Sequence, residues 1–290
     1  MSERPSCSII VPTRNRPEQL RSCLEGLAAL DYPQERLQVI AVDDSGNGAV
    51  AKDIPGWVEV AFTDRVGPAA ARNAGVERAE GELLAFTDDD CRPHADWLER
   101  LTPRYRGAPE EAVGGRTING LADNLFSETA QLVIDVGYAQ NNLGAPDRRW
   151  FTTNNLAGPR EGFLAVGGFD ARYRTAEDRD FCSRWTDSGR RMSYEPAAVV
   201  EHFRQLDLAA FAAMHFAYGR GAFRYHRDRR LRGHPVAIEP GYYAALAREA
   251  LRRSSGTRAA SLETLLVVWH VANTAGFLTE WARSVVERDT

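Results

Sequence analysis

Lysine, cysteine and long apolar runs are scarce in this sequence, and each scarcity excludes something. Lys52 is the single lysine, so arginine supplies nearly all of the positive charge. The cysteines are only four, lie far apart and form no CxxC pair: Cys7, Cys23, Cys91 and Cys182. We therefore expect neither a zinc site nor a disulfide framework, and a reducing compartment fits this usage.

Signals for export or membrane insertion are also missing. The N-terminal MSERPSCSII is too short and too polar for a signal peptide. The longest apolar stretch, residues 265–278, falls short of a membrane span because four residues interrupt it: His270, Asn273, Thr274 and Gly276. We expect a cytoplasmic protein that is soluble or peripherally attached to a membrane.

The net charge of −4 argues against a general nucleic-acid binder, although the charge is unevenly spread. Residues 204–258 hold eleven arginines against four acids, which makes this segment +7 and the remainder −11. The default interpretation is genomic composition and solvated arginine. The sharper one is a basic patch for a phosphate-bearing acceptor or an anionic membrane surface.

Apolar segments alternate with helical patterns along the first part of the chain. Four segments are typical of short buried strands, at residues 7–12, 37–42, 58–62 and 83–87. Helical spacing follows at residues 17–29, 68–79 and 94–106, and again at 208–226, 240–253 and 259–288. This alternation predicts an α/β fold with a largely parallel sheet covered on both faces.

Acidic and polar residues follow three of these strands. In an open α/β sheet, ligands bind beyond the carboxyl ends of the strands, where the sequence places Pro12-Thr13-Arg14, Asp43-Asp44 and Asp88-Asp89-Asp90. Five carboxylates at one edge repel one another unless a cation offsets them. Hard carboxylate oxygens suit Mg²⁺ or Mn²⁺, which also bind substrate phosphates. The alternative is a solvated acidic turn that caps the helix near His94.

The ordered set of motifs resembles family 2 of the inverting glycosyltransferases, which have the GT-A fold. The similarity runs, over about residues 7–203, through SIIVPTRNRPEQLRSCLEGL, VIAVDDSG, GPAAARNAG, GELLAFTDDDCRP, VGGFDARYRTAEDRDFCSRW and VVEHF. The resemblance implies a catalytic domain at 1–203, with a nucleotide-binding half at 1–112 and an acceptor-binding half at 113–203. A helical extension then occupies residues 204–290.

The resemblance also implies roles for residues that bind the donor. It places Pro12, Thr13 and Arg14 at the nucleotide base, Asp43 or Asp44 as the acid that accepts from base or ribose, and Arg72 near base and pyrophosphate. Asp88 and Asp90 match the ends of the DxD motif. Asp89 stands at the middle position, where the family tolerates aspartate, and we assign it to nucleotide-sugar binding. Asp88 faces ribose and metal, Asp90 binds the Mn²⁺ or Mg²⁺ that bridges the phosphates, and His202 completes the metal site.

Inverting transfer needs a base for the acceptor hydroxyl, and the candidates are Glu177 and Asp178. Asp178 lies at helical spacing from Phe181, Cys182 and Trp185, so we expect it to point inward, where burial raises its pKa. The alternative is a capping box that starts at Thr175. With the resemblance, we favour Asp178 as base and Glu177 as a supporting or acceptor-binding acid. We expect Asp180 to face solvent or to pair with Arg184.

Acceptor binding is the least specified part of the sequence. Asn154 follows a strand-like WFTTN and could reach the sugar, as could Asn155. Trp185 could stack on a pyranose ring, although core packing is the commoner fate of tryptophan. The apolar stretch from Leu262 to Trp281 could pack on the domain, form a dimer interface or lie in a membrane interface.

These residues together predict a metal-dependent glycosyltransferase. Its donor is a nucleotide diphosphate sugar, with UDP favoured, and its acceptor is an unidentified hydroxyl on a glycan, a lipid-linked sugar or a small molecule. One alternative is a sugar-phosphate nucleotidyltransferase, which needs a GxGTR-like loop where this chain has VPTRNRPEQ. Another is a degenerate sugar-nucleotide-binding module, which should lack the DxD motif, the ED pair or the late histidine. An NAD-binding protein is excluded because no GxGxxG follows a strand.

Overall fold

The structure is a computed structural model that describes residues 4–48, 50, 54–107, 110–143, 149–234 and 241–287, without the side chains of 103–107. Its chain divides into two compact units. Unit 1 comprises residues 1–118 and 145–203, and unit 2 comprises residues 119–144 and 204–290. One boundary between the units lies after residue 203, and residues 119–144, expected in the acceptor-binding half, group with the C-terminal helices.

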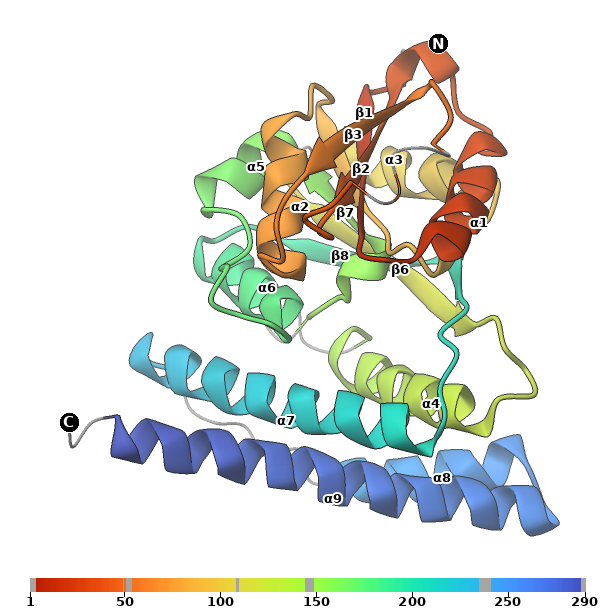
Figure 1. Ribbon diagram of the computed structural model, residues 1–290, viewed down its shortest axis with the longest axis vertical. Helices are drawn as coiled ribbons and strands as arrows, with labels where there is room; N and C mark the ends of the chain where they lie inside the picture. The colour runs from red at the N-terminus through yellow and green to blue at the C-terminus, as the bar shows by residue number, and fades with distance from the viewer. Residues whose placement is uncertain are drawn as a thin grey trace. The chain divides into compact units, whose positions relative to one another are not determined.

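Unit 1 is built on a mixed eight-stranded sheet with the order β3-β2-β1-β4-β7-β6-β8-β5 (Figure 1). The strands are β1 (Cys7–Thr13), β2 (Leu37–Asp43), β3 (Val58–Phe62), β4 (Leu83–Phe86), β5 (Cys91–Pro93), β6 (Ala112–Asn119), β7 (Leu156–Pro159) and β8 (Met192–His202). The parallel pairing that we expected holds for β3, β2, β1 and β4.

The other half of the sheet pairs antiparallel. Strand β7 runs antiparallel to both β4 and β6, and β5 runs antiparallel to β8. A parallel neighbour needs a crossover of a dozen or so residues. Only residues 87–90 separate β4 from β5, which is too short a connection, so β5 pairs with a strand from the far end of unit 1. This pairing brings the acidic triplet next to the end of β8.

Helices cover both faces of the sheet. They are α1 (Pro17–Ala28), α2 (Pro68–Glu77), α3 (Trp97–Gly107), α5 (Arg160–Ala165) and α6 (Glu177–Asp187). Side chains alternate along β1, so that Ile9 packs in one core with α1 and α3, while Ile10 faces Gly75 of α2 on the other side. Prolines occupy the first turns of α1 and α2, where a missing N–H costs nothing.

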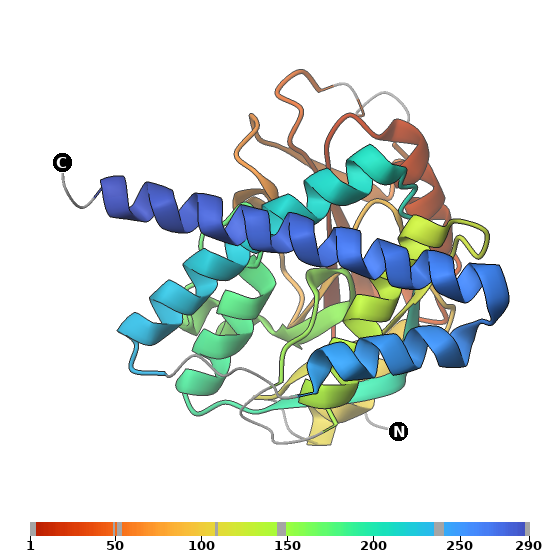
Figure 2. The ribbon, with the colours of Figure 1, turned by 90° about the horizontal axis from the view of Figure 1, so that it is seen from below.

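Unit 2 is helical. Its helices are α4 (Leu125–Asn141), α7 (Leu208–Leu231), α8 (Tyr242–Arg253) and α9 (Gly256–Val286), and Figure 2 shows α9 extended along the whole unit. They share a core that includes Leu132, Phe211, Leu246, Leu262 and Trp269. The three C-terminal helices were predicted within a few residues, and the predicted ends at 240 and 288 lie outside the described residues.

The helices of unit 2 owe their lengths to local signals as well as to this core. Asn124 and Asp207 cap α4 and α7, because their side chains accept from the backbone N–H groups of Ser127 and Ala210. Over the described residues, none of the helices combines the length and the apolarity that a membrane crossing requires.

Candidate active site

The ends of β1 and β4 bring polar residues together at one edge of the sheet. Asp89 is 4% exposed, and its Oδ2 accepts a hydrogen bond from Thr13 Oγ1 at 2.8 Å. Its Oδ1 accepts from Arg16 at 3.1 Å. Burial raises the pKa of Asp89 to about 6, against the opposing effect of the Arg16 guanidinium. The middle acid of the triplet therefore ties two strand ends together.

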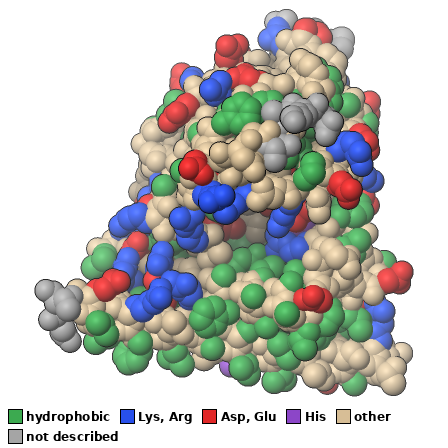
Figure 3. All heavy atoms as spheres, in the orientation of Figure 1, with side chains coloured by type: hydrophobic (Ala, Val, Ile, Leu, Met, Phe, Trp, Pro, Cys, Tyr) green, Lys and Arg blue, Asp and Glu red, His purple; other side chains and the backbone are tan. Residues whose placement is uncertain are grey.

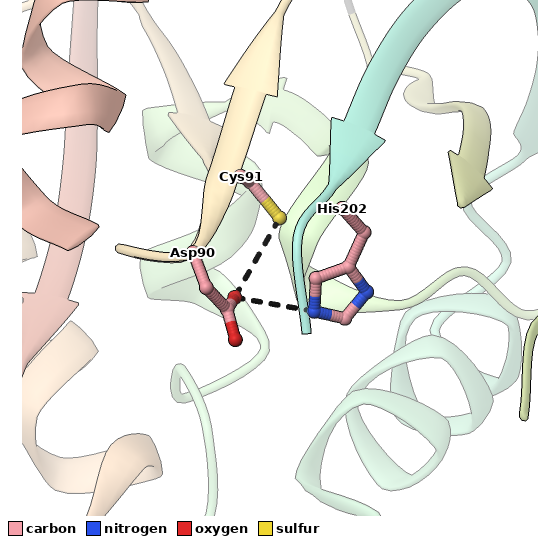
Figure 4. Close-up of side chains that lie close together, drawn as sticks. All are labelled: Asp90, Cys91 and His202. Carbon is pink, nitrogen blue, oxygen red and sulfur yellow. Dashed lines mark hydrogen bonds and ion pairs between the residues drawn. The ribbon is translucent and has the colours of Figure 1, made fainter. Parts of the chain in front are cut away.

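Asp90 shares Arg16 with Asp89, at 3.4 Å from its Oδ2, and its Oδ1 reaches β8. Cys91 pairs with His202 across β5 and β8, and Asp90 Oδ1 lies 3.1 Å from His202 Nε2. Figure 4 shows the side chains of Asp90, Cys91 and His202 converging, and one potential ligand atom of each lies within 4.8 Å of the others. His202 Nε2 is buried and has no hydrogen-bond partner, which is costly unless another group uses its lone pair.

This cluster fits a divalent cation. A carboxylate and an imidazole nitrogen are common ligands of Mn²⁺ and related ions. Cys91 was not predicted as part of the site, and the available signal in the sequence was its place directly after Asp90. Among the described residues, this is the one group of histidine, cysteine and acidic side chains that could hold an ion, and it does not include Asp88.

Asp88 is joined instead to a buried arginine. Arg72, on α2, is 3% exposed and donates to Asp88 Oδ1 at 2.6 Å and to Glu177 Oε1 at 2.9 Å. Its guanidinium thereby connects the acidic triplet after β4 with the acid pair at the start of α6. The charges of Asp88 and Glu177 hold the pKa of Arg72 above its usual range even though burial acts to lower it.

The acid pair begins helix α6. Ala176 is the N-cap, with a left-handed φ of 70°, and its methyl group cannot cap the helix. Burial raises the pKa of Glu177 to about 7, against the lowering effect of Arg72. Burial also raises the pKa of Asp178, whose Oδ1 accepts from the backbone N–H of Arg179 at 2.7 Å. Both carboxyls are therefore better bases than ordinary surface acids.

Asp180 and Arg184 form the predicted i,i+4 pair, with 2.7 Å between Asp180 Oδ2 and Arg184 Nε. The alternative expectation, that Asp180 faces solvent, is wrong, because Asp180 is only 2% exposed. Arg184 also donates to the carbonyl of Val166 at 2.6 Å and to that of Gly168 at 2.7 Å. The pair thus fastens the glycine-rich turn before α6 to the helix itself.

The two acids after β2 organise loops. Asp43 is fully buried and accepts from the backbone N–H of Ser45 at 2.9 Å. Asp44 accepts from the N–H groups of Val66 at 2.8 Å and Gly67 at 3.0 Å. Because Gly67 is the N-cap of α2, Asp44 helps to set the start of the helix that carries Arg72. Asp44 Oδ1 also accepts from the Thr63 hydroxyl at 2.8 Å.

The predicted acceptor-binding residues are buried. Trp185 has no exposed surface, and its indole N–H donates to the carbonyl of Arg191 at 2.9 Å. Its proposed stacking on a sugar is wrong, because core packing against Phe181 takes up the ring. Asn154 is 6% exposed, and its Oδ1 accepts from Thr152 at 2.6 Å and Thr117 at 3.1 Å.

Asn155 is also buried. Its amide nitrogen donates to the carbonyls of Arg116 and Ala198, both at 3.0 Å, so it braces strands. Of the residues at the end of β1, Arg14 is exposed and Pro12 is half-buried. Arg14 is therefore the most accessible of the residues that the sequence assigned to the nucleotide.

The sequence is similar to a known protein family and to several named proteins. Residues 8–179 match the family described as Glycosyl transferase family 2. Glycosyltransferase AglE of Haloferax volcanii is 27% identical over 214 residues, which are 69% of this chain and 68% of that protein. The glucosyl-dolichyl phosphate glucuronosyltransferase of the same organism is 26% identical over 217 residues, 67% of this chain and 68% of the relative.

Two solved structures share the fold. The mannosyltransferase PcManGT from Pyrobaculum calidifontis, in complex with GDP-Man and Mn²⁺, superposes with a TM-score of 0.60 at 21% identity, over 99% of this chain and 81% of that one. GalNAc-T7 with UDP, GalNAc and Mn²⁺ gives a TM-score of 0.58 at 15% identity, over 84% of this chain and 54% of the other.

Proposed function

The chain belongs to glycosyl transferase family 2 and has a GT-A fold, and from this premise we propose that it transfers a sugar, with inversion, from a nucleotide diphosphate sugar to a hydroxyl group. The observation that carries this proposal is the buried His202 Nε2, which lacks a hydrogen bond and lies 3.1 Å from the last acid of the triplet. A second support is Arg72, which connects that triplet with a pair of acids of raised pKa.

Asp90 and His202 would hold the cation, with Cys91 beside them and Asp88 nearby in sequence. When bound, a divalent cation stabilises the charge that develops on the leaving diphosphate. A nitrogen ligand favours Mn²⁺ over Mg²⁺, because Mg²⁺ prefers an all-oxygen shell. The two structural neighbours described above carry Mn²⁺.

The chain's own acids would take the proton from the acceptor. Asp178 is our candidate base, and Glu177 supports it from the Arg72 ion pair. Burial raises the pKa of both, to about 7 for Glu177, so each is a stronger base than an exposed carboxylate. The fixed guanidinium of Arg72 would keep these acids in place beside the donor, which serves positioning.

The donor site would lie at the carboxyl ends of β1, β2 and β4, with Thr13, Arg14 and Asp44 among the residues that contact the nucleotide. UDP-sugars and GDP-sugars are both donors to test, since one structural neighbour holds UDP and the other holds GDP-mannose. For the acceptor, a lipid-linked sugar is the class to test first, because one relative is named for a dolichyl phosphate acceptor.

Replacing Asp90 tests the metal role. We expect Asp90→Ala to abolish Mn²⁺-dependent release of the nucleoside diphosphate from UDP-sugars or GDP-mannose, because the ion loses its carboxylate ligand. Asp96→Ala is the matched control, since Asp96 is an exposed acid paired with Arg100. Thermal melting establishes that both variants fold. Normal turnover by a folded Asp90→Ala protein, or full wild-type turnover in EDTA, would contradict the proposal.

A further inference from the structure

The outward face of α9 is apolar and lies open in unit 2. Five apolar residues on this face are each 43% to 62% exposed, and we call them the outer stripe: Val267, Val271, Leu278, Trp281 and Val285. At 100° per residue these five positions fall within roughly 40° of one line along the helix. The buried residues Leu262, Trp269 and Gly276 lie on the opposite side. The helix therefore has two apolar faces, and the core of unit 2 uses only one.

No charge interrupts the outer stripe over its central part. Residues 264–279 contain no Asp, Glu, Lys or Arg. Glu280 is buried against α7, where Arg220 and Arg224 pair with it at 2.8 Å and 2.6 Å. Figure 3 shows hydrophobic side chains gathered along the lower edge of the molecule, over α9. A solvated helix face of this length normally carries charged residues.

Excess positive charge lies near one end of this apolar face. Residues 220–232, at the end of α7, hold six arginines against Asp228. The ion pairs with Glu280 place the start of this basic segment beside the half of α9 that carries Trp281. Near the other end of α9, three arginines are paired with acids: Arg252 with Glu249, Arg253 with Glu249 and Asp135, and Arg258 with Glu128. The excess positive charge therefore lies near the end of the apolar face that carries Trp281.

We propose that the outer stripe of α9 docks unit 2 onto an anionic membrane surface, with the helix lying in the interface. An apolar face with a tryptophan and a basic segment near one end is a pattern of interfacial helices. The described helices are not long and apolar enough to span a bilayer, which agrees with a helix that lies flat. The inference does not depend on the transferase activity.

A second copy of the chain fits this face less well. A parallel two-fold pairing of α9 would bring two copies of the basic segment 220–232 together. That arrangement brings like charges together, whereas anionic lipid complements the basic segment.

Vesicle sedimentation with the full chain tests the proposal. We expect binding to phosphatidylcholine vesicles that contain phosphatidylglycerol, weaker binding at high salt, and little binding to pure phosphatidylcholine. Trp281→Glu should weaken binding by about 10-fold or more, because it puts a charge on the buried face. Trp57→Glu is the matched control, since Trp57 is 45% exposed and Trp281 53%, and Trp57 lies in unit 1.

A second readout places the stripe in the bilayer. Lipids with brominated chains should quench tryptophan fluorescence in the wild type and in Trp57→Phe, and quench it less in Trp281→Phe. The inactive Asp90→Ala protein should bind vesicles normally, which separates this test from the transferase proposal. The proposal is wrong if the wild type does not bind anionic vesicles at low salt, or if Trp281→Glu binds as the wild type does. It is also wrong if Trp281→Glu dissociates a dimer present without lipid, which would assign the face to a second copy.

Discussion

At the scale of single residues, the site depends on one buried arginine. Arg72 is 3% exposed and neutralises two carboxylates that lie far apart in the chain, Asp88 and Glu177. Removing one partner from such a buried group typically costs about 3–5 kcal/mol, because the remaining charges lose their compensation. Arg72 therefore contributes to the fold of unit 1 as well as to the proposed chemistry, and its substitution would mix the two effects.

The acid pair offers a cleaner prediction. We expect Asp178→Asn to lower transfer by about 10²–10⁴-fold, the usual size of a general-base contribution, while donor binding persists. Asn is nearly isosteric and removes only the charge. The measurement is donor affinity by calorimetry beside the transfer rate at saturating donor. Glu177→Gln is the comparison, and it should act more through acceptor affinity. If Glu177→Gln is inactive and Asp178→Asn is normal, the base is Glu177.

The same pair predicts a pH dependence. The pKa of Glu177 is raised to about 7 and that of Asp178 is also raised, chiefly by burial. A carboxyl acts as a base only when ionised, so the transfer rate should fall on the acid side, and it should fall through the region near 7 if transfer requires ionised Glu177. Because the charge of Asp178 raises the pKa of Glu177, Asp178→Asn should move the residual acid limb to lower pH. A flat pH–rate profile from 5.5 to 8 would contradict this assignment.

At the scale of elements, the sequence predicts what depends on local pattern. The strand at 58–62 has the predicted bounds, and the helical face of Leu20, Leu24 and Leu27 packs as expected. The three-residue strand β5 was missed, because its pairing with β8 depends on residues about 110 positions away. For the same reason the sequence could place Asp90 and His202 in one site only by resemblance, and it could not foresee that Arg72 joins Glu177.

Helix α7 carries a histidine that should make unit 2 sensitive to acid. His215 is 3% exposed, neither ring nitrogen has a hydrogen-bond partner, and burial lowers its pKa from 6.5 to about 3. The folded state therefore favours the neutral ring, so stability is complete above pH 6.5 and declines as the pH falls toward 3. By pH 5 the loss should reach about 2 kcal/mol. In His215→Phe, thermal melts followed by the helical signal should lose this part of the pH dependence. Parallel pH dependences in both proteins would contradict the prediction.

The contact between α7 and α9 depends on two glycines. A Cβ on Gly219 would lie 1.9 Å from the carbonyl oxygen of Asn273, and one on Gly276 would lie 1.9 Å from that of Phe216. Neither backbone oxygen can move without separating the helices, so Gly219→Ala and Gly276→Ala should each destabilise unit 2 by about 2–3 kcal/mol. Gly56→Ala is the control, because nothing lies within 4 Å of its added methyl group. Urea unfolding measures all three, and an unchanged midpoint in both helix variants would show that the crossing adapts.

At the scale of the whole molecule, the chain combines a discontinuous catalytic unit with a helical unit that interrupts it. Each has its own hydrophobic core. All of the proposed donor and metal residues lie in unit 1, and the outer stripe of α9 lies in unit 2. The sequence indicated this division at residue 203. It did not assign 119–144 to the helical unit. The sequence pattern of an amphipathic helix shows which face is apolar, but it does not show which core that face packs against.

The division predicts where a ligand should stabilise the chain. A ligand that binds only the folded state at about 100-fold its dissociation constant adds roughly 2.7 kcal/mol. Mn²⁺ with UDP or GDP should therefore raise the melting temperature, and hydrogen exchange should slow in unit 1 around residues 13–16, 43–45 and 88–91. Exchange in α8 and α9 should stay as it was, because no proposed ligand contact lies there. Asp90→Ala is the control, and it should lose the Mn²⁺-dependent part of both effects. Protection confined to unit 2, or equal stabilisation of Asp90→Ala, would move the nucleotide site away from the ends of β1, β2 and β4.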